Sequence, residues 1–259
     1  KPMPSVAHGL PSSHTWDPWS WCEGYPGDGT VKVTVSADNR RELVDTTRPQ
    51  FVQSSLRCAG HPPKQTHGRC DEVAVRSELH CPAPDFSRGL GDLLPYARTI
   101  LRPLLATCKP GQQVLVLGLG GGAIPTYIQN LCPGVHVLAV EKNASVVAAA
   151  KDFFAYTGEA AVKDVRAALA EFSKTKPASF DAVVTDVGHE IHLNKQDMRG
   201  VLKLLKPGGL VVENLSTPSF LGEQLKLYKE FLGNVSAEAS GSNRILFGRS
   251  PMPAWTIES

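Results

Sequence analysis

The chain has 259 residues, 42% of them hydrophobic, and its 27 Lys and Arg against 25 Asp and Glu leave a formal charge of +2. This length allows one large domain with a smaller appendage, and the hydrophobic content is ordinary for a packed core. A charge this small provides no electrostatic basis for nucleic-acid binding, so a nucleic-acid partner is disfavoured. No window reaches the roughly 18 uncharged apolar residues of a membrane helix, and we expect no membrane partner.

The first part of the chain changes character twice. Residues 1–29 are rich in Pro, Gly and Trp without helical or strand periodicity, which predicts an irregular arm. The segment 30–56 alternates apolar and polar residues around a turn, which predicts a small β unit. Its antiparallel strands are expected at 30–36, 41–45 and 49–55.

Residues 57–92 contain much Pro, several His and Cys and little apolar periodicity, which predicts a long loop or insertion. Its mixture of His and Cys lacks the C-x-x-C and H-x-x-x-H spacings of zinc sites, so we predict no metal site. Six Cys occur in the chain. A chain of this length does not need disulfide bonds to fold, so we expect reduced thiols and a cytoplasmic location. A start at Lys1 rather than Met leaves organellar and secreted locations open.

From residue 93 to 250 the pattern is that of alternating strands and helices, followed by a short tail at 251–259. Strands are expected near 113–118, 135–140, 181–186 and 209–214, with helical segments between them. Asn143 is placed to cap one of these helices. The segments "NVSAEAS" and "NRILFGR" then predict an antiparallel hairpin. The expected fold is α/β, with a parallel sheet covered by helices on both faces.

One strand of this domain runs directly into a glycine-rich turn, "VLVLGLGGGAIP", at residues 114–125. Gly118, Gly120 and Gly122 allow sharp turns and a close approach of the backbone to a ligand, and the following helix offers unpaired N–H groups. The loop fits a dinucleotide site, an S-adenosylmethionine site or a plain strand-to-helix turn. Taken alone, it leaves all three open.

Three acidic residues at strand ends bear on which ligand the loop holds. Glu141 ends "VHVLAVE", where a carboxylate at the end of the second strand accepts from ribose hydroxyls in both cofactor classes. Asp164 follows a third short strand, where it could accept from an adenine amino group. Asp186 ends the fourth strand at the substrate edge of the sheet. Together with the antiparallel ending, this order favours S-adenosylmethionine over a dinucleotide.

Residues 30–249 resemble the spermidine-synthase-like branch of class I methyltransferases. The resemblance rests on "RRELV", "FVQSSL", "VLVLGLGGGAIP", "LAVEKNASVVAAAKDFFAY", "FDAVVTDV", "PGGLVVENL" and "NRILF". It implies a seven-stranded Rossmann-like sheet, a small N-terminal β unit beside it, and Gln53 reaching the cofactor. The implied cofactor set is Gln53, Gly118, Gly120, Gly122, Glu141, Lys142, Asp164, Val165 and Asp186, with S-adenosyl-L-methionine as the cofactor.

The chain departs from the aminopropyltransferases of this branch at three places. Their loop aspartate is replaced by Gly121, their Tyr-His pair by Tyr96-Ala97, and their Asp-Ser-Ser by Asp186-Val187-Gly188. Polyamine synthesis is therefore the less favoured activity, and methyl transfer is the leading hypothesis. A cofactor fold that has become a binding or scaffolding subunit is a third hypothesis.

Methyl transfer from an activated sulfonium needs mainly the positioning of a nucleophile, so few side chains need to be catalytic. Asp186 is the candidate for orienting or deprotonating an acceptor amine, with Asn214 and His189 as weaker candidates. The acceptor is expected to be a protein amine or a small metabolite, and a homodimer is expected by analogy with the branch.

Overall fold

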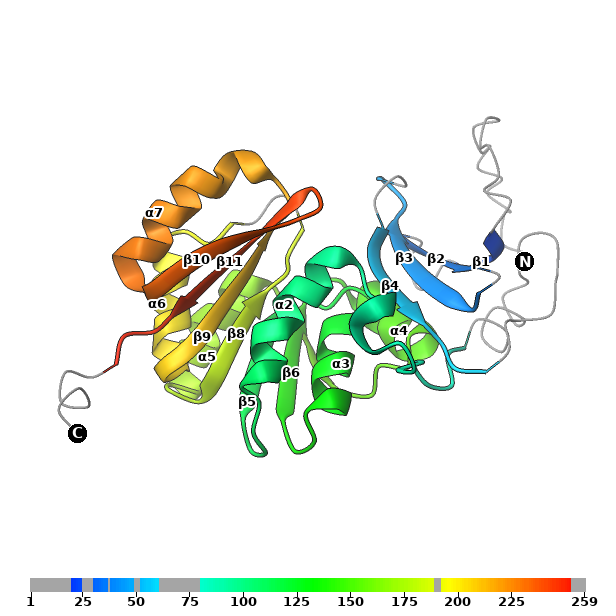
Figure 1. Cartoon of the computed structure of the whole chain (residues 1–259), viewed down its shortest axis with the longest axis horizontal. Coiled ribbons are helices and arrows are strands. Elements are labelled where there is room, and N and C mark those ends of the chain that lie inside the picture. Colours follow the sequence, from blue (N-terminus) through cyan, green and yellow to red (C-terminus); the bar gives the residue numbers. More distant parts are fainter. Residues whose placement is uncertain are drawn as a thin grey trace, which may run out of the picture.

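The computed structural model of the chain has two β-sheets lying next to each other, a small antiparallel sheet and a larger one flanked by helices (Figure 1). It describes residues 20–24, 30–36, 38–48, 52–60, 80–188 and 192–252. Within this part of the chain, no helix is long and apolar enough to cross a membrane.

The small sheet has four antiparallel strands in the order β1-β2-β3-β4. They are β1 (Ser20–Gly24), β2 (Val31–Ser36), β3 (Arg40–Asp45) and β4 (Val52–Arg57). Alternate residues of β2 are buried, as the sequence period predicted. The prediction of an irregular arm is wrong for β1, because this segment lacks strand periodicity yet pairs with β2 through its backbone.

The larger sheet has seven strands in the order β10-β11-β9-β8-β5-β6-β7. The strands are β5 (Gln113–Leu117), β6 (His136–Glu141), β7 (Glu159–Val162), β8 (Phe180–Thr185), β9 (Leu205–Leu215), β10 (Gly233–Ser240) and β11 (Asn243–Arg249). The strands from β7 to β9 pair in parallel, whereas β11 lies antiparallel between β9 and β10. This confirms the expected α/β class and the Rossmann-like seven-stranded sheet with its small N-terminal β unit.

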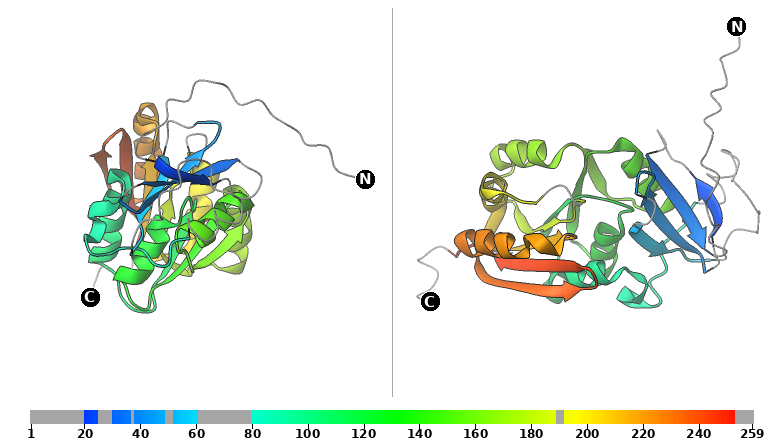
Figure 2. Two further views of the ribbon diagram at one scale, coloured as in Figure 1. Left: turned by 90° about the vertical axis from the view of Figure 1, so that its right-hand side faces the viewer. Right: turned by 90° about the horizontal axis from the view of Figure 1, so that it is seen from above.

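Helices cover both faces of this sheet (Figure 2). They are η1 (Gly89–Asp92), α2 (Pro95–Ala106), α3 (Ala123–Leu131), α4 (Ala144–Phe153), α5 (Val165–Thr175), α6 (Lys195–Leu204), η2 (Pro218–Phe220) and α7 (Leu221–Phe231). The central strand β5 shows the two-sided packing. Val114 and Val116 belong to one apolar cluster with residues of α2, α3 and α4, and Leu115 and Leu117 to a second with residues of α5, α6 and α7.

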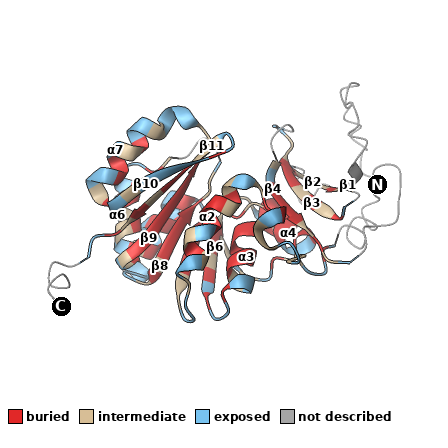
Figure 3. Cartoon of the chain, viewed as in Figure 1, coloured by how far each residue is buried: buried red, intermediate tan, exposed pale blue. Residues whose placement is uncertain are grey.

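Burial is concentrated in the strands and the inward helix faces (Figure 3). Asn143 caps α4 as predicted, since its side chain accepts from the backbone N–H of Ser145 at 2.8 Å.

The "PGG" of "LKPGGLVVENL" lies inside β9 at an irregularity of its pairing with β8. α7 was not among the predicted helices.

A buried carboxylate ties the segment before α2 to the small sheet, and the two sheets share one apolar cluster. Asp92, 1% exposed, lies at the end of η1 and forms ion pairs with Arg40 of β3 at 3.4 Å and Arg57 of β4 at 3.2 Å. The shared cluster contains Leu43 of the small sheet and Val116 of the large sheet. The small N-terminal sheet is thus packed against the domain that contains the large sheet.

Two disulfides contradict the expectation of reduced thiols. Cys58 at the end of the small sheet is bonded to Cys81, and Cys108 after α2 is bonded to Cys132 after α3. Their Cα atoms are 5.5 and 6.1 Å apart, within the normal range for disulfides. Sequence spacing could not reveal these pairs because the fold, rather than the chain order, brings the partners together.

The predicted loop at 57–92 is partly described. His61, His67 and Cys70 lie outside the described residues, as do Trp16 and Trp19 of the arm. Residues 80–92 run along the small sheet, where Cys58 forms an isolated bridge with Pro84. His80 places its Nδ1 atom 3.0 Å from the backbone oxygen of Asp152. The proposed boundaries at 30–56, 57–92 and 93–250 stay predictions.

Candidate functional site

The predicted site residues gather where the carboxyl ends of β5, β6 and β8 meet, beside β4 of the small sheet. The backbone N–H of Gly118 donates to Val140 at 2.8 Å, and the N–H of Asp186 donates to Leu117 at 2.8 Å. These bonds hold the ends of neighbouring strands in register. The side chains that follow each strand therefore lie at one edge of the sheet.

The glycine loop depends on backbone conformations that suit glycine. Gly118, Gly120 and Gly122 have φ angles of +93°, +52° and +75°. A Cβ atom on Gly118 would lie 2.1 Å from the backbone oxygen of Asp186. This glycine is therefore required for the close passage of the segment after β8, independently of any ligand.

Gly121 is surrounded by side chains. A Cβ atom there would lie 2.8 Å from Cδ1 of Phe154 and 3.0 Å from Cβ of Ser54. Phe154 is fully buried and Ser54 belongs to β4. The position that carries an aspartate in aminopropyltransferases thus has no room here for a side chain unless its neighbours move.

Glu141 at the end of β6 connects two loops. Its Oε2 accepts from the backbone N–H of Leu119 in the glycine loop at 3.2 Å, and its Oε1 accepts from that of Asn143 at 3.0 Å. A carboxylate offers about four acceptor positions. About half of the acceptor positions of Glu141 therefore remain open to a ligand beside the glycine loop.

Asp164 follows β7 and caps α5. Its Oδ1 accepts from the backbone N–H groups of Arg166 and Ala167 at 2.9 and 3.2 Å, which leaves Oδ2 to face solvent or a ligand. Val165, the next residue, is buried. Lys142 is exposed beside Glu141. The carboxylate of Asp164 could accept from an amino group on an aromatic ring, and the apolar side chain of Val165 could pack against the ring itself.

Asp186 follows β8 and is held by a chain of amides. Nδ2 of Asn214 on β9 donates to Oδ1 of Asp186 at 2.8 Å, and Nδ2 of Asn243 on β11 donates to Oδ1 of Asn214 at 2.9 Å. Because Asn243 occupies the oxygen of Asn214, it directs the NH₂ group of Asn214 toward the carboxylate. Of the two weaker candidates, Asn214 thus contacts Asp186, while His189 lies outside the described residues.

Tyr96 on α2 brings the small sheet into this site. Its hydroxyl donates to the backbone oxygen of Gln53 on β4 at 2.8 Å and neighbours Asp186. Burial, followed by the Asp186 carboxylate, raises the pKa of Tyr96 well above its usual value, so the phenol stays protonated. The side chain of Gln53 is exposed beside it.

The surroundings of Asp186 change its acidity. Burial raises the pKa of the Asp186 carboxyl to about 6, and the hydrogen bond from Asn214 lowers it in part. At neutral pH the carboxyl is therefore mostly ionised and able to accept a proton. A carboxyl with this pKa in a hydrogen-bonded setting is suited to acid-base chemistry.

Tyr96 and Asn243 were not among the predicted site residues. Tyr96 was singled out only as the place where the Tyr-His pair is incomplete, and Asn243 lies in a hairpin without a chemical motif. In the described part of the chain, no group of three His, Cys, Asp or Glu residues is placed to bind a metal ion.

Comparisons with known proteins bear on the family and the fold. Residues 115–212 match a methyltransferase domain family. Two curated relatives are polyamine aminopropyltransferases. The one from Vibrio vulnificus is 27% identical over 170 residues, and the one from Chromobacterium violaceum is 33% identical over 171 residues. The matches cover 59% and 61% of this chain but only 54% and 65% of those proteins.

Solved structures share the fold. The crystal structure of a probable spermidine synthase from Corynebacterium glutamicum superposes with a TM-score of 0.58 at 17% identity, covering 89% of this chain and 79% of that one. Human methyltransferase-like protein 13 in complex with SAH gives a TM-score of 0.53 at 20% identity, covering 62% and 83%. The chain therefore has the fold of a spermidine-synthase-like class I methyltransferase.

Proposed function

We propose that this chain is a methyltransferase that binds S-adenosyl-L-methionine at the carboxyl edge of its large sheet and methylates an amine. The observation that carries this proposal is the packing of Gly121 against Phe154 and Ser54, beside an intact Asp186. Aminopropyltransferases of this branch have an aspartate at this position of the loop. In this chain the phenyl ring of Phe154 occupies the space beside Gly121.

The residues of this edge fit the proposed cofactor. The spare acceptor positions of Glu141 suit the two ribose hydroxyls, and Oδ2 of Asp164 suits the adenine amino group. No side chain of α3 caps its first turn, whose N–H groups follow the glycine loop. Gln53, Lys142 and Val165 complete the proposed contacts.

S-adenosylmethionine supplies a methyl group activated by a sulfonium. Asp186 accepts a hydrogen bond from the acceptor amine and directs the nitrogen lone pair toward that methyl carbon. As the new N–C bond forms and the S–C bond breaks, the electron pair of the S–C bond goes to sulfur. The proton lost by the nitrogen is transferred to Asp186, whose pKa of about 6 leaves it ionised at neutral pH. Asn214 holds the carboxylate in place through its amide N–H, and Tyr96 lies beside it.

The proposal is tested by isothermal titration calorimetry with S-adenosylmethionine, S-adenosylhomocysteine and decarboxylated S-adenosylmethionine. We expect the first two to bind, and Glu141→Ala to weaken binding at least tenfold. Glu223→Ala, which removes an exposed carboxylate from α7, is the matched control and should bind as the wild type does. No binding of either carboxylated ligand would overturn the proposal.

Aminopropyl transfer is the second candidate because both curated relatives are polyamine aminopropyltransferases. It predicts tight binding of decarboxylated S-adenosylmethionine and spermidine formation from putrescine. If the protein bound the decarboxylated form more tightly than S-adenosylmethionine and formed spermidine, aminopropyl transfer would replace methyl transfer. A third candidate, a scaffolding subunit, predicts cofactor binding without turnover on any amine tested.

We infer further that the protein works in an oxidising compartment. Disulfides persist where glutathione and thioredoxin do not reduce them, and two disulfides lie in the described part of the chain. This inference replaces the cytoplasmic expectation, which rested on reduced thiols. The acceptor is proposed to be a protein amine or a small amine, with a homodimer as the working form.

A further inference from the structure

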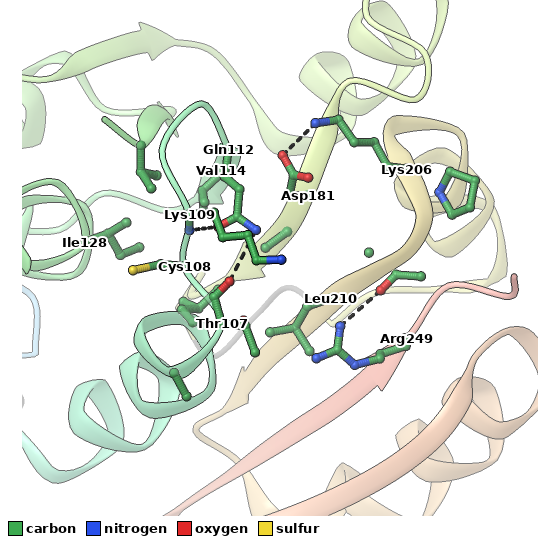
Figure 4. A pocket seen from close by; sticks show the side chains of 17 residues that line it. Thr107, Cys108, Lys109, Gln112, Val114, Ile128, Asp181, Lys206, Leu210 and Arg249 are labelled. Atoms are coloured by element: carbon green, nitrogen blue, oxygen red, sulfur yellow. Dashed lines mark hydrogen bonds and ion pairs between the residues drawn. The ribbon is translucent and has the colours of Figure 1, made fainter. Parts of the chain in front are cut away.

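A second candidate site lies at the opposite edge of the large sheet. A cavity of about 440 Å³ opens at the amino ends of β5 and β8 and is walled by α2, the start of β9 and the end of β11 (Figure 4). Asp181 in its lining and Asp186 at the proposed catalytic edge are five residues apart on one strand, or about 16 Å. This volume is in the range of small-molecule sites.

The inner part of the cavity is apolar. Its lining includes side chains from α2, β5, α3 and β9, namely Leu104, Val114, Ile128 and Leu210, together with Val135. Each of these five is buried, with an exposed fraction of 8% or less. Because the cavity is open to solvent, these side chains form an apolar floor with little exposed surface. A ligand with a hydrocarbon body would cover this surface.

The rim of the cavity carries an excess of positive charge. Lys109, Lys206 and Arg249 line it, and Asp181 is the only acid in the lining. Asp181 is already neutralised, because its Oδ2 accepts from Nζ of Lys206 at 2.7 Å and from the backbone N–H of Gln113 at 2.8 Å. The lining therefore has a net charge of +2, supplied by Lys109 and Arg249.

These two cations are available to a ligand. Within the described residues the ammonium group of Lys109 forms no ion pair, and the guanidinium group of Arg249 donates only to the backbone oxygen of Gly208, at 3.1 Å. An arginine bound to one carbonyl keeps several of its five donors free. Figure 4 shows Lys109 and Arg249 at the same opening, with Lys206 nearby and paired with Asp181.

The walls are held in place by covalent and hydrogen bonds. The Cys108–Cys132 disulfide ties the segment after α2 to the end of α3, and Oε1 of Gln112 accepts from the backbone N–H of Lys109 at 2.8 Å. On the other side, Ser250 Oγ donates to the backbone oxygen of Lys206 at 2.8 Å. The backbone that carries Lys109 and the segment facing it are thus held by the frame of the cavity before any ligand arrives.

We propose that this cavity binds a small organic anion with an apolar body, its anionic group between Lys109 and Arg249 and its body against Leu104 and Leu210. The site is separate from the proposed catalytic edge and does not depend on the activity there. A protein with two such sites would bind this anion and S-adenosylhomocysteine at the same time.

The probe is 1-anilinonaphthalene-8-sulfonate, whose fluorescence reports entry into an apolar site. We expect one site per chain, displacement by octanoate but not by 1-octanol at equal concentration, and no displacement by saturating S-adenosylhomocysteine. Lys109→Gln and Arg249→Gln should each weaken binding about fivefold to tenfold. Lys109→Arg should retain binding, and Lys226→Gln, on the exposed face of α7, should leave it unchanged.

Circular dichroism of each variant shows whether the fold is intact. Displacement of the probe by S-adenosylhomocysteine would assign it to the catalytic edge and overturn the proposal. Equal affinity of the wild type and a folded Lys109→Gln, Arg249→Gln double variant would also overturn it, as would equal displacement by octanoate and 1-octanol. Failure of S-adenosylmethionine to bind would leave this site unaffected.

Discussion

The carboxyl of Asp186 is subject to two opposing effects at the residue scale. Burial raises its pKa to about 6, while the amide of Asn214 donates to the charged form and the phenol of Tyr96 lies beside it. Asn214 has this orientation because Asn243, on the antiparallel strand β11, donates to its oxygen. The acidity of the proposed catalytic group is therefore set by three separate strands and α2.

Replacing Asn214 should therefore make Asp186 less acidic. In a carboxyl ¹³C NMR titration we expect the wild-type midpoint near pH 6 and a higher midpoint in Asn214→Leu, because one hydrogen bond to the charged form is lost. Asn130→Leu, which alters an exposed amide on α3, is the control. A wild-type midpoint near pH 4, or an unchanged midpoint in Asn214→Leu, would contradict this account.

Gly121 allows a second test at this scale. Gly121→Ala places a methyl group 2.8 Å from Phe154 Cδ1, so we expect a loss of about 1 to 3 kcal/mol in the free energy of unfolding by urea. Cofactor binding should weaken as the loop shifts. Gly222→Ala is the control, because its Cβ would meet nothing within 4 Å. Equal stability of Gly121→Ala and the wild type would show that the loop adjusts freely.

At the scale of elements, Glu213 on β9 holds α7 and the segment before α6 against the sheet. Its carboxylate accepts from the backbone N–H of Leu193 at 3.2 Å and from Nε2 of Gln224 on α7 at 3.1 Å. Glu213 is 1% exposed, and burial raises its pKa to about 7. Helix α7, which the sequence pattern did not predict, is thus held against the sheet by the buried carboxylate of Glu213.

The raised pKa of Glu213 predicts a pH-dependent stability. A carboxyl with a pKa of 4.5 in the unfolded chain and about 7 in the folded one binds more protons when folded. Its contribution is therefore complete below pH 4.5 and is lost as the pH rises through 7. Urea unfolding should show Glu213→Gln gaining up to about 3 kcal/mol over the wild type between pH 4.5 and 8. Glu223→Gln on the same helix should show no such trend, and parallel pH profiles for Glu213→Gln and the wild type would refute the effect.

The disulfides also act between elements. Cys58–Cys81 closes a loop with a sequence separation of 23, and Cys108–Cys132 one of 24. Removing either pair as a double Ala variant should lower the free energy of unfolding by about 3 kcal/mol through the entropy of the unfolded chain. Reducing the disulfides of the wild type should also lower its free energy of unfolding. An unchanged urea midpoint after thiol release, quantified with a thiol reagent, would show that the bonds carry no stability.

At the scale of the whole molecule, the two sheets form one packed body. Asp92, in the segment before α2, pairs with Arg40 and Arg57 of the small sheet, and Arg88 adds a third, exposed partner at 3.6 Å. The two sheets also share one apolar cluster. Gln53 and Ser54 of the small sheet lie beside Tyr96 and the glycine loop. The proposed cofactor site therefore depends on the contact between the sheets.

Asp92→Ala should destabilise both sheets together. Removing the buried carboxylate leaves Arg40 and Arg57 with the more exposed Asp38 as their shared acidic partner. We therefore expect a loss of about 2 to 3 kcal/mol and a single thermal transition at lower temperature. Glu238→Ala, which removes a partner from an exposed pair with Arg102, should change stability by less than about 1 kcal/mol. Two separate transitions in Asp92→Ala would mean that the sheets unfold independently.

The elements with strong periodicity could be predicted from the chain itself. The alternation in 30–36, the apolar run before Gly118 and the capping position of Asn143 each depend on residues close in sequence, so local rules identify them. The glycine loop, Glu141, Asp164 and Asp186 were found because strand ends recur at fixed places in an alternating fold. β1 and α7 were not: β1 lacks strand periodicity and forms through its backbone pairing with β2, and α7 is held by contacts such as that of Gln224 with Glu213.

The sequence by itself determined the α/β class and which acidic residues stand at the strand ends, because hydrophobic period and strand order are properties of the chain. Only the tertiary structure decided that Phe154 fills the space beside Gly121, that Cys58 pairs with Cys81 and that Asn243 orients Asn214. It also decided that Lys109 and Arg249 meet at one cavity. Each of these is a contact between residues at least 20 positions apart, whose proximity follows from packing and not from local sequence.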